Sequence, residues 1–400
     1  MDGVYCLRVN RRQTQDFRKC LQSKGLLDGS LSLVKDSDGF VLLPLTLSTV
    51  SQLDLHALQT TMGSNDACQL VWTQTPPPCS KRKGGKRSCN KLEGLLQELL
   101  ESHGERWSEE IKEDLPLSFQ RHGDLVLIGD NTFCLSLWKK MGEDLWSTVA
   151  KGLGAKRLAK QGRVSRDGFR TPEVTMLLGE DSWVTHVDNG ISYQFDVTKC
   201  MFSSGNITEK LRVAAFDCTG ETVVDLYAGI GYFTLPYLMH ANACHVHACE
   251  WNLEAVKALQ KNLNVNGVSN RCTVYQGDNR QLQLCDVADR VNLGLIPSSE
   301  EGWPVACRLL KRTTGGVLHI HQNVTSQLQA RHDVPQGLSG KRADRRAWQE
   351  WANETAEKIA SLLKDVTGGQ WTTNIQHIER VKSYAPHVHH LVLDLECRPS

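Results

Sequence analysis

Two glycines and two acidic residues have the spacing of a nucleoside-binding site. Gly229 and Gly231 stand in the stretch VVDLYAGIGYFTLP, where a predicted strand meets a predicted helix. Glycines at such a turn let the backbone approach a ligand closely and present amide N–H groups. Glu250 lies nineteen residues after Gly231, at the end of the next strand, where a carboxylate can accept hydrogen bonds from both ribose hydroxyls. Asp278, after the third strand, is placed to hold an adenine amino group.

S-adenosylmethionine is the nucleoside that fits this pattern best. NAD is the competing ligand, but Thr234 stands where the third glycine of its G-x-G-x-x-G fingerprint belongs. Asp225, which ends the first strand, joins the expected cofactor contacts. The alternative interpretation is that these residues are only turn glycines and surface acids.

An alternation of strands and helices from about residue 205 positions these groups. Five predicted strands are separated by helical stretches, and a long helix covers roughly residues 343–366. Two final strands, near NIQHIERV and HHLVLDLEC, are joined tightly enough to be antiparallel. Strands alternating with helices specify a parallel sheet with right-handed crossovers. We therefore expect an α/β protein: a class I methyltransferase-type Rossmann fold with a seven-stranded, mostly parallel sheet at the C-terminus, preceded by smaller α+β modules.

Composition along the chain predicts four regions. Residues 1–75 form a small N-terminal α+β module, and residues 76–104 form a flexible basic linker, because TQTPPPCSKRKGGKRSCNK is rich in proline, glycine and positive charge. Residues 105–204 form a middle α+β module that contacts tRNA or substrate. Residues 205–400 form the Rossmann-type catalytic domain that binds the cofactor.

Basic residues are concentrated in two places although the formal net charge is only +1. Residues 81–87 carry five basic groups and no acid, and residues 151–170 carry seven against the single Asp167. Such patches bind polyanions while the whole chain stays near neutral. The alternative is an ordinary solvated surface.

Cysteine usage and hydropathy indicate the compartment. The 14 cysteines include no C-x-x-C pair, so we expect no zinc framework and no disulfide scaffold. The start, MDGVYCLRVN, lacks the apolar core of a signal peptide, and no apolar run approaches the roughly eighteen residues of a membrane span. We expect a soluble, cytoplasmic protein with no membrane partner. Nothing in the sequence indicates an oligomeric state.

Histidines gather in CHVHACE, LHIHQ and HVHH. They alternate along predicted strands, so we expect neighbouring histidines on opposite faces and no metal site.

A family resemblance adds to this picture. The segment HVDNGISYQFDVTKCMFSSGNITEKLRV, together with DLYAGIGYFTLP, CEWN and QGDNRQL, resembles the tRNA guanine-37 N1-methyltransferases and their sister wybutosine-synthesis enzymes. The resemblance covers about residues 120–400 and is closest to the wybutosine branch, which contains a 3-amino-3-carboxypropyl transferase. It implies that S-adenosylmethionine is the group donor and that phenylalanine tRNA is the partner.

The resemblance also marks further site residues. The family's Phe-Ser followed by Glu-Arg is matched by Phe202-Ser203 and Glu209-Lys210, which implies cofactor contacts by Ser203 and Lys210 and by Asn279 beside Asp278. Arg170, in FRTPEVTMLLG, is the expected substrate-side residue, with a salt-bridged surface arginine as the alternative. We assign no catalytic base; Glu209 is a weakly supported option, because its carboxylate can instead fix the loop.

One departure from the family concerns the reaction. The methyltransferases carry Asn-Pro-Pro after the fourth strand, where this chain reads Leu295-Ile296-Pro297-Ser298-Ser299. Three carbons of the sulfonium are electrophilic, and positioning decides which one reacts. The missing motif argues against guanine methylation. The resemblance implies transfer of the aminocarboxypropyl group to 4-demethylwyosine at position 37, with release of methylthioadenosine. Methylation at N1, or a non-catalytic tRNA-binding protein that kept the fold, are the alternatives.

Overall fold

The computed structural model describes most of the chain. The described residues are 4–10, 13–23, 25–28, 31–36, 40–46, 53, 58, 68–73, 81–165, 169–326, 340–385 and 387–400. They divide into two compact units, one with residues 1–120 and 126–158, the other with residues 121–125 and 159–400. The second unit contains all the residues predicted to contact the cofactor, and Arg170.

The N-terminal end of the chain folds as a small α+β module. Its four strands form an antiparallel sheet in the order β2-β3-β1-β4. Leu7, Val9, Phe17 and Leu21 are fully buried in its core, because one face of the sheet packs against one face of the helix. The elements are β1 (Val4–Asn10), α1 (Thr14–Ser23), β2 (Val34–Lys35), β3 (Phe40–Pro44) and β4 (Cys68–Thr73).

Helix α3 (Lys81–Ser102) occupies much of the stretch that we expected to be a linker, and this expectation is corrected. Leu92, Leu96 and Leu100 recur every fourth residue and are buried, so they form one apolar face of a helix. That face packs on α5 (Gly142–Leu153), where a Cβ on Gly152 would lie 2.8 Å from the Leu92 backbone. Proline, glycine and charge in residues 76–90 concealed this face. The side chains of residues 81–90, including the basic run, lie outside the described part.

The elements that follow α3 include a sheet in the order β5-β6-β7-β8. They are α4 (Glu109–Glu113), β5 (Phe119–His122), β6 (Leu125–Gly129), η3 (Ser136–Met141), β7 (Arg157–Val164) and β8 (Pro172–Leu178).

A hairpin of β9 (Trp183–Asp188) and β10 (Ile191–Asp196) precedes the large sheet. Asn189 and Gly190 both have positive φ, 50° and 77°, which suits the two-residue turn of such a hairpin. The hairpin is tied to helix α8 (Leu253–Val265), because the Gln194 N–H donates to the Asn262 Oδ1 over 2.6 Å.

The large sheet has seven strands in the order β13-β12-β11-β14-β15-β17-β16. The first five are parallel and the last two antiparallel, so the predicted fold class is confirmed. The strands are β11 (Thr222–Asp225), β12 (His245–Glu250), β13 (Cys272–Gln276), β14 (Arg290–Leu293), β15 (Gly316–Thr325), β16 (Trp371–Ala385) and β17 (Val388–Pro399). Strand order reverses at β11, where such sheets bind ligands at their carboxyl ends.

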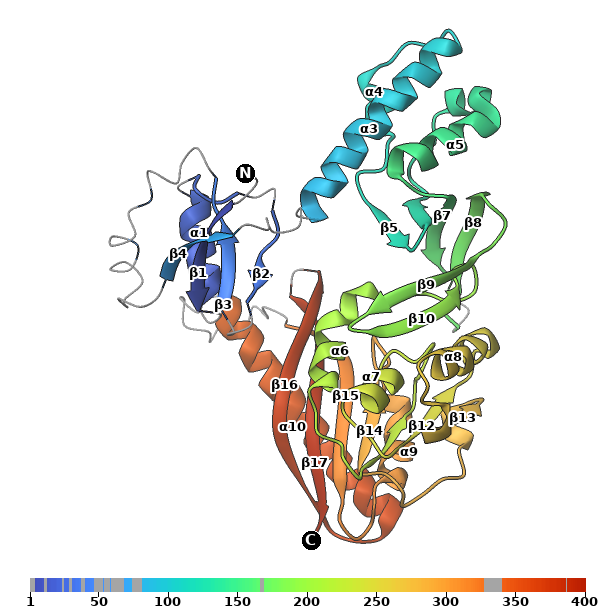
Figure 1. The fold of residues 1–400 in the computed structure, drawn as a ribbon. Helices are drawn as coiled ribbons and strands as arrows, with labels where there is room; N and C mark the ends of the chain where they lie inside the picture. Colours follow the sequence, from blue (N-terminus) through green and yellow to red (C-terminus); the bar gives the residue numbers. More distant parts are fainter. Residues whose placement is uncertain are drawn as a thin grey trace, which may run out of the picture. The chain divides into compact units, whose positions relative to one another are not determined.

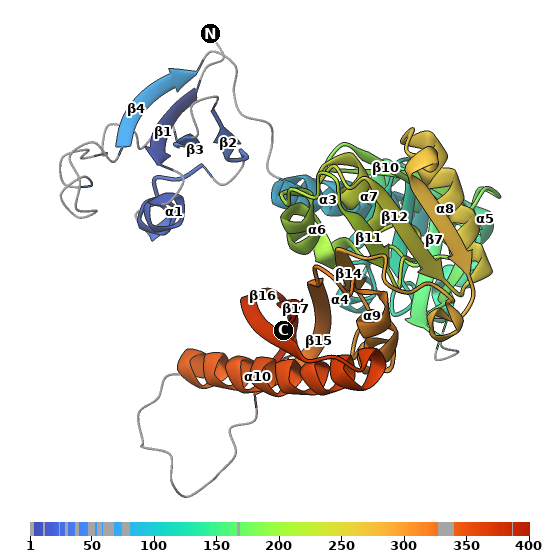
Figure 2. The same cartoon turned by 90° about the horizontal axis from the view of Figure 1, so that it is seen from below.

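Helices cover both faces of this sheet (Figures 1 and 2). Helix α10 (Gly340–Thr367) and α9 (Trp303–Leu309) lie on one face, and α7 (Thr234–Met239) and α8 lie on the other. Ile359 of α10 is fully buried, and Trp351 and Leu362 pack against the same core, as expected for an apolar stripe. Shorter elements are η4 (Ser204–Asn206), α6 (Ile207–Ala214), η5 (Ser269–Arg271), η6 (Asn279–Gln281) and η7 (Glu300–Gly302).

The expected placement of the histidines on opposite faces is wrong for CHVHACE. The rings of His245 and His247 lie 4.8 Å apart, because residues two apart on a strand share a face. Within the described residues, no group of three or more His, Cys, Asp or Glu side chains is arranged to hold a metal ion.

Candidate active site

A pocket with a volume of about 1050 Å³ lies at the carboxyl ends of four parallel strands. Leu226 follows β11, Glu250 ends β12, Gly277 follows β13 and Gly294 follows β14, and all four line it. Small-molecule pockets measure roughly 300–1,000 Å³. This pocket therefore has room for a nucleoside and part of a second molecule.

The glycine turn meets the pocket through one of its two glycines. Gly229 (φ 55°) lines the pocket, and its N–H donates to the Glu250 Oε2 over 2.8 Å. Gly231 (φ 102°) is not among the lining residues. A Cβ there would lie 3.1 Å from the side chains of Leu235 and Leu259. Gly231 therefore allows α7 and α8 to pack closely behind the turn.

Glu250 is held at the pocket by backbone donors. Its Oε1 accepts from the Asn252 N–H over 2.8 Å, while Oε2 accepts from Gly229. Burial raises the pKa of Glu250, and these backbone hydrogen bonds partly oppose the increase. Each carboxylate oxygen has two lone pairs, so both can still accept a hydroxyl donor from a ligand.

Asp278 and Asn279 also line the pocket. The Arg280 Nε donates to the Asp278 Oδ2 over 2.9 Å, and this hydrogen bond lowers the pKa of Asp278. The Asn279 side chain donates to the Leu226 carbonyl oxygen over 2.8 Å. The predicted set Gly229, Glu250, Asp278 and Asn279 therefore meets at one pocket.

Asp225 lies beneath the pocket and does not line it. Its side chain is fully buried and accepts from the Thr234 hydroxyl over 2.8 Å and from the Asn292 amide over 2.9 Å. Burial raises the pKa of Asp225, although hydrogen bonds from Asn292 and Thr234 act in the opposite direction. This geometry joins β11, α7 and β14 rather than presenting an acceptor to a ligand.

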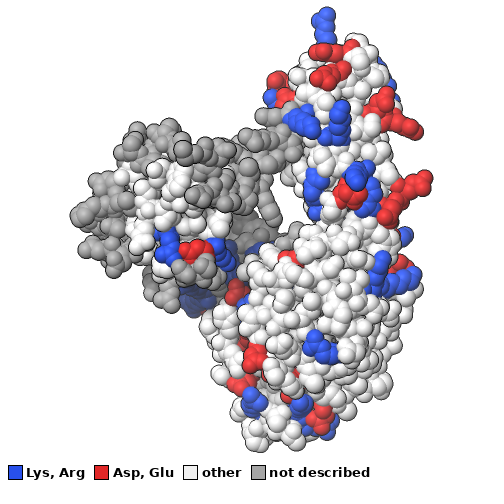
Figure 3. Space-filling view, in the orientation of Figure 1, with Lys and Arg blue, Asp and Glu red and all other residues white. Residues whose placement is uncertain are grey.

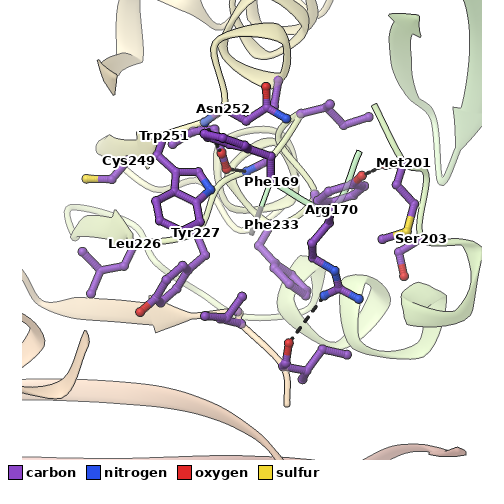
Figure 4. Close-up of a pocket in the computed structure, with 18 of the residues that line it drawn as sticks. Phe169, Arg170, Met201, Ser203, Leu226, Tyr227, Phe233, Cys249, Trp251 and Asn252 are labelled. Atoms are coloured by element: carbon purple, nitrogen blue, oxygen red, sulfur yellow. Dashed lines mark hydrogen bonds between the residues drawn. The ribbon is translucent and has the colours of Figure 1, made fainter. Parts of the chain in front are cut away.

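The segment before the sheet contributes Ser203, which lines the pocket near Met201 (Figure 4). Lys210 does not line it: this residue is 3% exposed and forms an ion pair with Asp188. Its ammonium lies 4.8 Å from the centroid of the Phe202 ring. Lys210 thus anchors α6 to the β9–β10 hairpin.

Glu209 is also buried away from the pocket. It accepts from the Arg212 guanidinium over 2.7 Å, and Arg212 donates in turn to Asp394 over 3.0 Å. Burial alone would raise the pKa of Asp394, but His319 and Arg212 lower it below its usual value. This network joins α6 to β17, and it leaves Glu209 without access to a substrate in the pocket.

Arg170 projects into the pocket from the loop before β8 (Figure 4). Its backbone has a φ of 56°, uncommon for a residue with a side chain, and its Nη1 lies 3.5 Å from the Ile296 carbonyl oxygen. The loop after β14 lines the same region through Leu295, Ile296 and Pro297. Arg170 is therefore placed to meet a molecule that enters beside this loop.

The two serines of that loop make internal hydrogen bonds. The Ser298 hydroxyl donates to the Gln322 side chain over 3.2 Å, and the buried Ser299 hydroxyl donates to the His321 carbonyl oxygen over 3.3 Å. Both bonds attach the loop to β15. Ser298 therefore forms part of the pocket wall and Ser299 is buried behind it, and neither makes a hydrogen bond to a side-chain base within the described residues.

Several lining residues were not predicted from the sequence. Phe169 and Trp251 are each about half exposed, at 50% and 49%, with ring centroids 5.5 Å apart. Trp251 follows Glu250 directly, so its position beside a strand end was a usable signal. Lys382 and Tyr384 line the pocket from β16, more than a hundred residues further along the chain, and no local pattern marked them.

The basic stretch of residues 151–170 is exposed only in part. Lys151, Lys156, Arg163 and Arg170 are exposed, whereas Arg157 and Lys160 are half-buried. In Figure 3, charges of both signs are scattered over the face shown. None of the helices in the described part of the chain is long and apolar enough to cross a membrane.

Three family models match successive parts of the chain. Residues 184–337 match the TRM5/TYW2 methyltransferase domain, and residues 6–83 and 96–182 match two models of the TYW2 N-terminal domain. These matches include the glycine turn, Glu250 and Asp278.

Curated relatives match over the full length. The tRNA wybutosine-synthesizing protein 2 homolog of Danio rerio is 56% identical over 412 residues, covering 100% of both chains. The Homo sapiens protein of the same name is 50% identical, covering 96% of this chain and 92% of that one.

Solved structures share the fold. The crystal structure of P. horikoshii TYW2 in complex with MeSAdo is 28% identical and has a TM-score of 0.56, covering 76% of this chain and 99% of that one. Trm5b from Pyrococcus abyssi, 22% identical with a TM-score of 0.55 over 99% of each chain, shows likeness of fold alone.

Proposed function

Since the chain belongs to the TRM5/TYW2 family, on its wybutosine-synthesizing branch, we propose that it transfers the 3-amino-3-carboxypropyl group of S-adenosylmethionine to tRNA. The acceptor is the 4-demethylwyosine base at position 37 of phenylalanine tRNA, and methylthioadenosine is released. The observation that carries this proposal is the 56% identity to a wybutosine-synthesizing protein across the full length of both chains.

The pocket supports the proposal through its nucleoside end. Glu250 accepts hydrogen bonds from the two ribose hydroxyls, because its oxygens face the pocket with lone pairs still available. Asp278 and Asn279 are placed to contact the adenine. Gly229 gives the ligand close access to the backbone at the switch point of the sheet. Ser203 also lines the pocket and is placed to contact another part of the donor.

The reaction displaces a neutral sulfide. The bond between sulfur and the first carbon of the amino acid arm breaks, and its electron pair goes to sulfur. The same carbon forms a bond to the acceptor base, which gives up a proton. The protein contributes by holding that carbon in line with the acceptor, because positioning supplies much of the rate. The space beside Arg170 and the loop after β14 is where the acceptor enters.

The tRNA binds through phosphate contacts outside the pocket. Lys151, Lys156 and Arg163 are exposed, so they are available to phosphates. A base in the anticodon loop must leave its stack to reach the pocket, which costs a few kcal/mol. Phosphate contacts offset that cost. We place the protein in the cytoplasm, in keeping with cysteines that are free throughout the described residues.

Isotope-labelled donors test the reaction. The protein is incubated with tRNA that carries 4-demethylwyosine and with S-adenosylmethionine labelled either in the carboxyl carbon or in the methyl group. We expect the carboxyl label on tRNA and the methyl label in the small-molecule fraction. Methyl label on tRNA would show a methyltransferase, and donor binding without label on tRNA would show a non-catalytic protein. Either result rejects the proposal.

A further inference from the structure

Lys382 is a cation in the wall of the pocket that comes from a distant part of the sequence. It lies on β16, is half-buried and lines the pocket together with Ser203 and Gly205. A Cβ built on Gly205 would lie 2.7 Å from the Lys382 Nζ, so the ammonium lies against the backbone of η4. The Tyr384 ring lies under it, with its centroid 4.7 Å from Nζ, and restricts its position.

Lys382 differs from Arg280, another cation of the pocket wall, in its partners. Arg280 forms ion pairs with Asp278 and Glu301. The Lys382 ammonium makes no ion pair with any carboxylate among the described residues. A half-buried cation that lacks an anionic neighbour has lost part of its hydration, and the Tyr384 ring offsets only part of that loss. An anion bound beside it restores the balance.

The pocket has two chemically different ends. Glu250 and Asp278 lie at the carboxyl ends of β12 and β13, and their oxygens suit the hydroxyl and amino donors of a nucleoside. Lys382 lies at the end formed by Ser203 and Gly205. Figure 4 shows Arg170 between Phe233 and Ser203, with its guanidinium directed at the carbonyl oxygen of Ile296. A donor that places its nucleoside at the first end extends its amino acid arm toward the second.

We propose that Lys382 binds the α-carboxylate of the aminocarboxypropyl arm. This inference rests on the proposed function for the identity of the donor, and it names the residue that holds the transferred group. The carboxylate moves with the group from sulfur to the acceptor base. Lys382 therefore contacts the reacting fragment both before and after transfer, whereas the nucleoside product lacks the group that Lys382 binds.

Decarboxylated S-adenosylmethionine is the probe that isolates this contact, because it keeps the sulfonium, the amine and the nucleoside. Binding of both donors is measured by calorimetry for the wild type and for Lys382→Met, which keeps much of the side-chain length without the charge. We expect Lys382→Met to bind S-adenosylmethionine about tenfold to a hundredfold more weakly, as for the loss of a hydrogen bond to a charged group. Its affinity for the decarboxylated donor should stay within about twofold of the wild type.

Arg380→Met is the matched control. Arg380 is on the same strand, donates to the Ser383 hydroxyl over 2.7 Å and does not line the pocket. This variant should bind both donors as the wild type does. Lys382→Arg keeps the charge and should retain the preference for the carboxylated donor.

Two results would overturn the inference. If Lys382→Met bound both donors more weakly by the same factor, Lys382 would have a structural role and no contact specific to the carboxylate. Unchanged binding of both, with weaker tRNA binding, would make it a phosphate contact. If Lys382→Met does not fold, the extent of acylation of Lys382 in the wild-type chain tests the same contact. S-adenosylmethionine should protect the Lys382 amine from acylation, and the decarboxylated donor should not. Transfer of a labelled methyl group would reject the proposed function without changing these binding results, because a methyltransferase also holds the arm.

Discussion

Two carboxylates at neighbouring strand ends have opposite surroundings: Asp225 lies beneath the pocket, in what we call its floor, and Glu250 lines the pocket, in what we call its rim. Asp225 and Glu250 end neighbouring parallel strands, and burial raises the pKa of both. Asp225, in the floor, is enclosed by side-chain donors from Thr234 and Asn292. Glu250, in the rim, is held by backbone donors and lines the pocket. A strand-end acid therefore becomes a ligand contact only where the fold leaves part of its oxygen surface free.

The largest expected effect is on the free energy of unfolding, and it follows from a substitution of Asp225 in the floor. Asp225→Ala removes the acceptor for two buried donors, so it should lower the free energy of unfolding by about 3 kcal/mol. Urea unfolding at neutral pH measures this change. Glu357→Ala, at an exposed carboxylate of α10, is the control and should change stability by less than about 0.5 kcal/mol. Wild-type stability in Asp225→Ala combined with lost donor binding would place Asp225 in the rim.

The matching change in the rim should affect binding more than folding. Glu250→Ala removes the ribose acceptor, and we expect S-adenosylmethionine to bind about thirtyfold more weakly, a loss of about 2 kcal/mol. Calorimetry measures the affinity and urea unfolding checks the fold. Glu254→Ala is the control. Glu254 is on the next helix, and within the described residues its carboxylate pairs only with Lys257, over 2.7 Å. This variant should bind S-adenosylmethionine as the wild type does. Unchanged donor affinity in Glu250→Ala would refute the nucleoside assignment.

Low pH should reduce the stability of the folded chain, because two histidines, His321 and His390, are buried in the large sheet. His321 Nδ1 and His390 Nε2 lie 3.0 Å apart, and the His321 ring is 5.2 Å from that of Phe233 in the pocket wall. Burial, with neighbouring Lys382, lowers the pKa of His390 to about 4, and burial, with neighbouring histidines and Arg212, lowers that of His321 well below its usual value. Both histidines stay neutral in the folded chain when their unfolded counterparts take up protons.

The free energy of unfolding should therefore have its full value above pH 6.5, the ordinary pKa of histidine, and should fall as the pH drops toward 4. The expected slope is about 1.4 kcal/mol per pH unit for each histidine in this window. Urea unfolding at pH 7, 6 and 5 measures it. His321→Asn should reduce the slope, and a stability that stays constant from pH 7 to 5 in the wild type would contradict the lowered pKa values.

The smallest expected effect lies outside both floor and rim. Neutralising the exposed Lys151, Lys156 and Arg163 with glutamine should weaken tRNA binding and reduce the slope of log affinity against log salt by about one for each lost phosphate contact. Donor affinity and unfolding should not change. Lys257→Gln is the control, and an unaltered salt slope in the triple variant would remove these residues from the tRNA contact.

Local patterns predicted the sheet and most of the nucleoside end. Alternating strands and helices specify a parallel sheet. The acids at the ends of β12 and β13 are close in sequence to those strands, so the position of Glu250 and Asp278 at the pocket could be predicted, while their contacts with a nucleoside stay a prediction. Asp225 has a similar local context, and Lys210 was marked only by the family resemblance. Their partners, Asn292 and Asp188, are set by tertiary packing. Lys382 reaches the pocket only because β16 pairs with β17 at the far side of the sheet. Basic composition likewise concealed the buried leucines of α3.

The nucleoside product tests the central claim most directly. Wild-type protein is incubated with S-adenosylmethionine and tRNA that carries 4-demethylwyosine, and the released nucleoside is identified by chromatography. Transfer of the aminocarboxypropyl group predicts one methylthioadenosine for each tRNA modified. S-adenosylhomocysteine as the stoichiometric product would show that the methyl group moves instead, and would contradict the account.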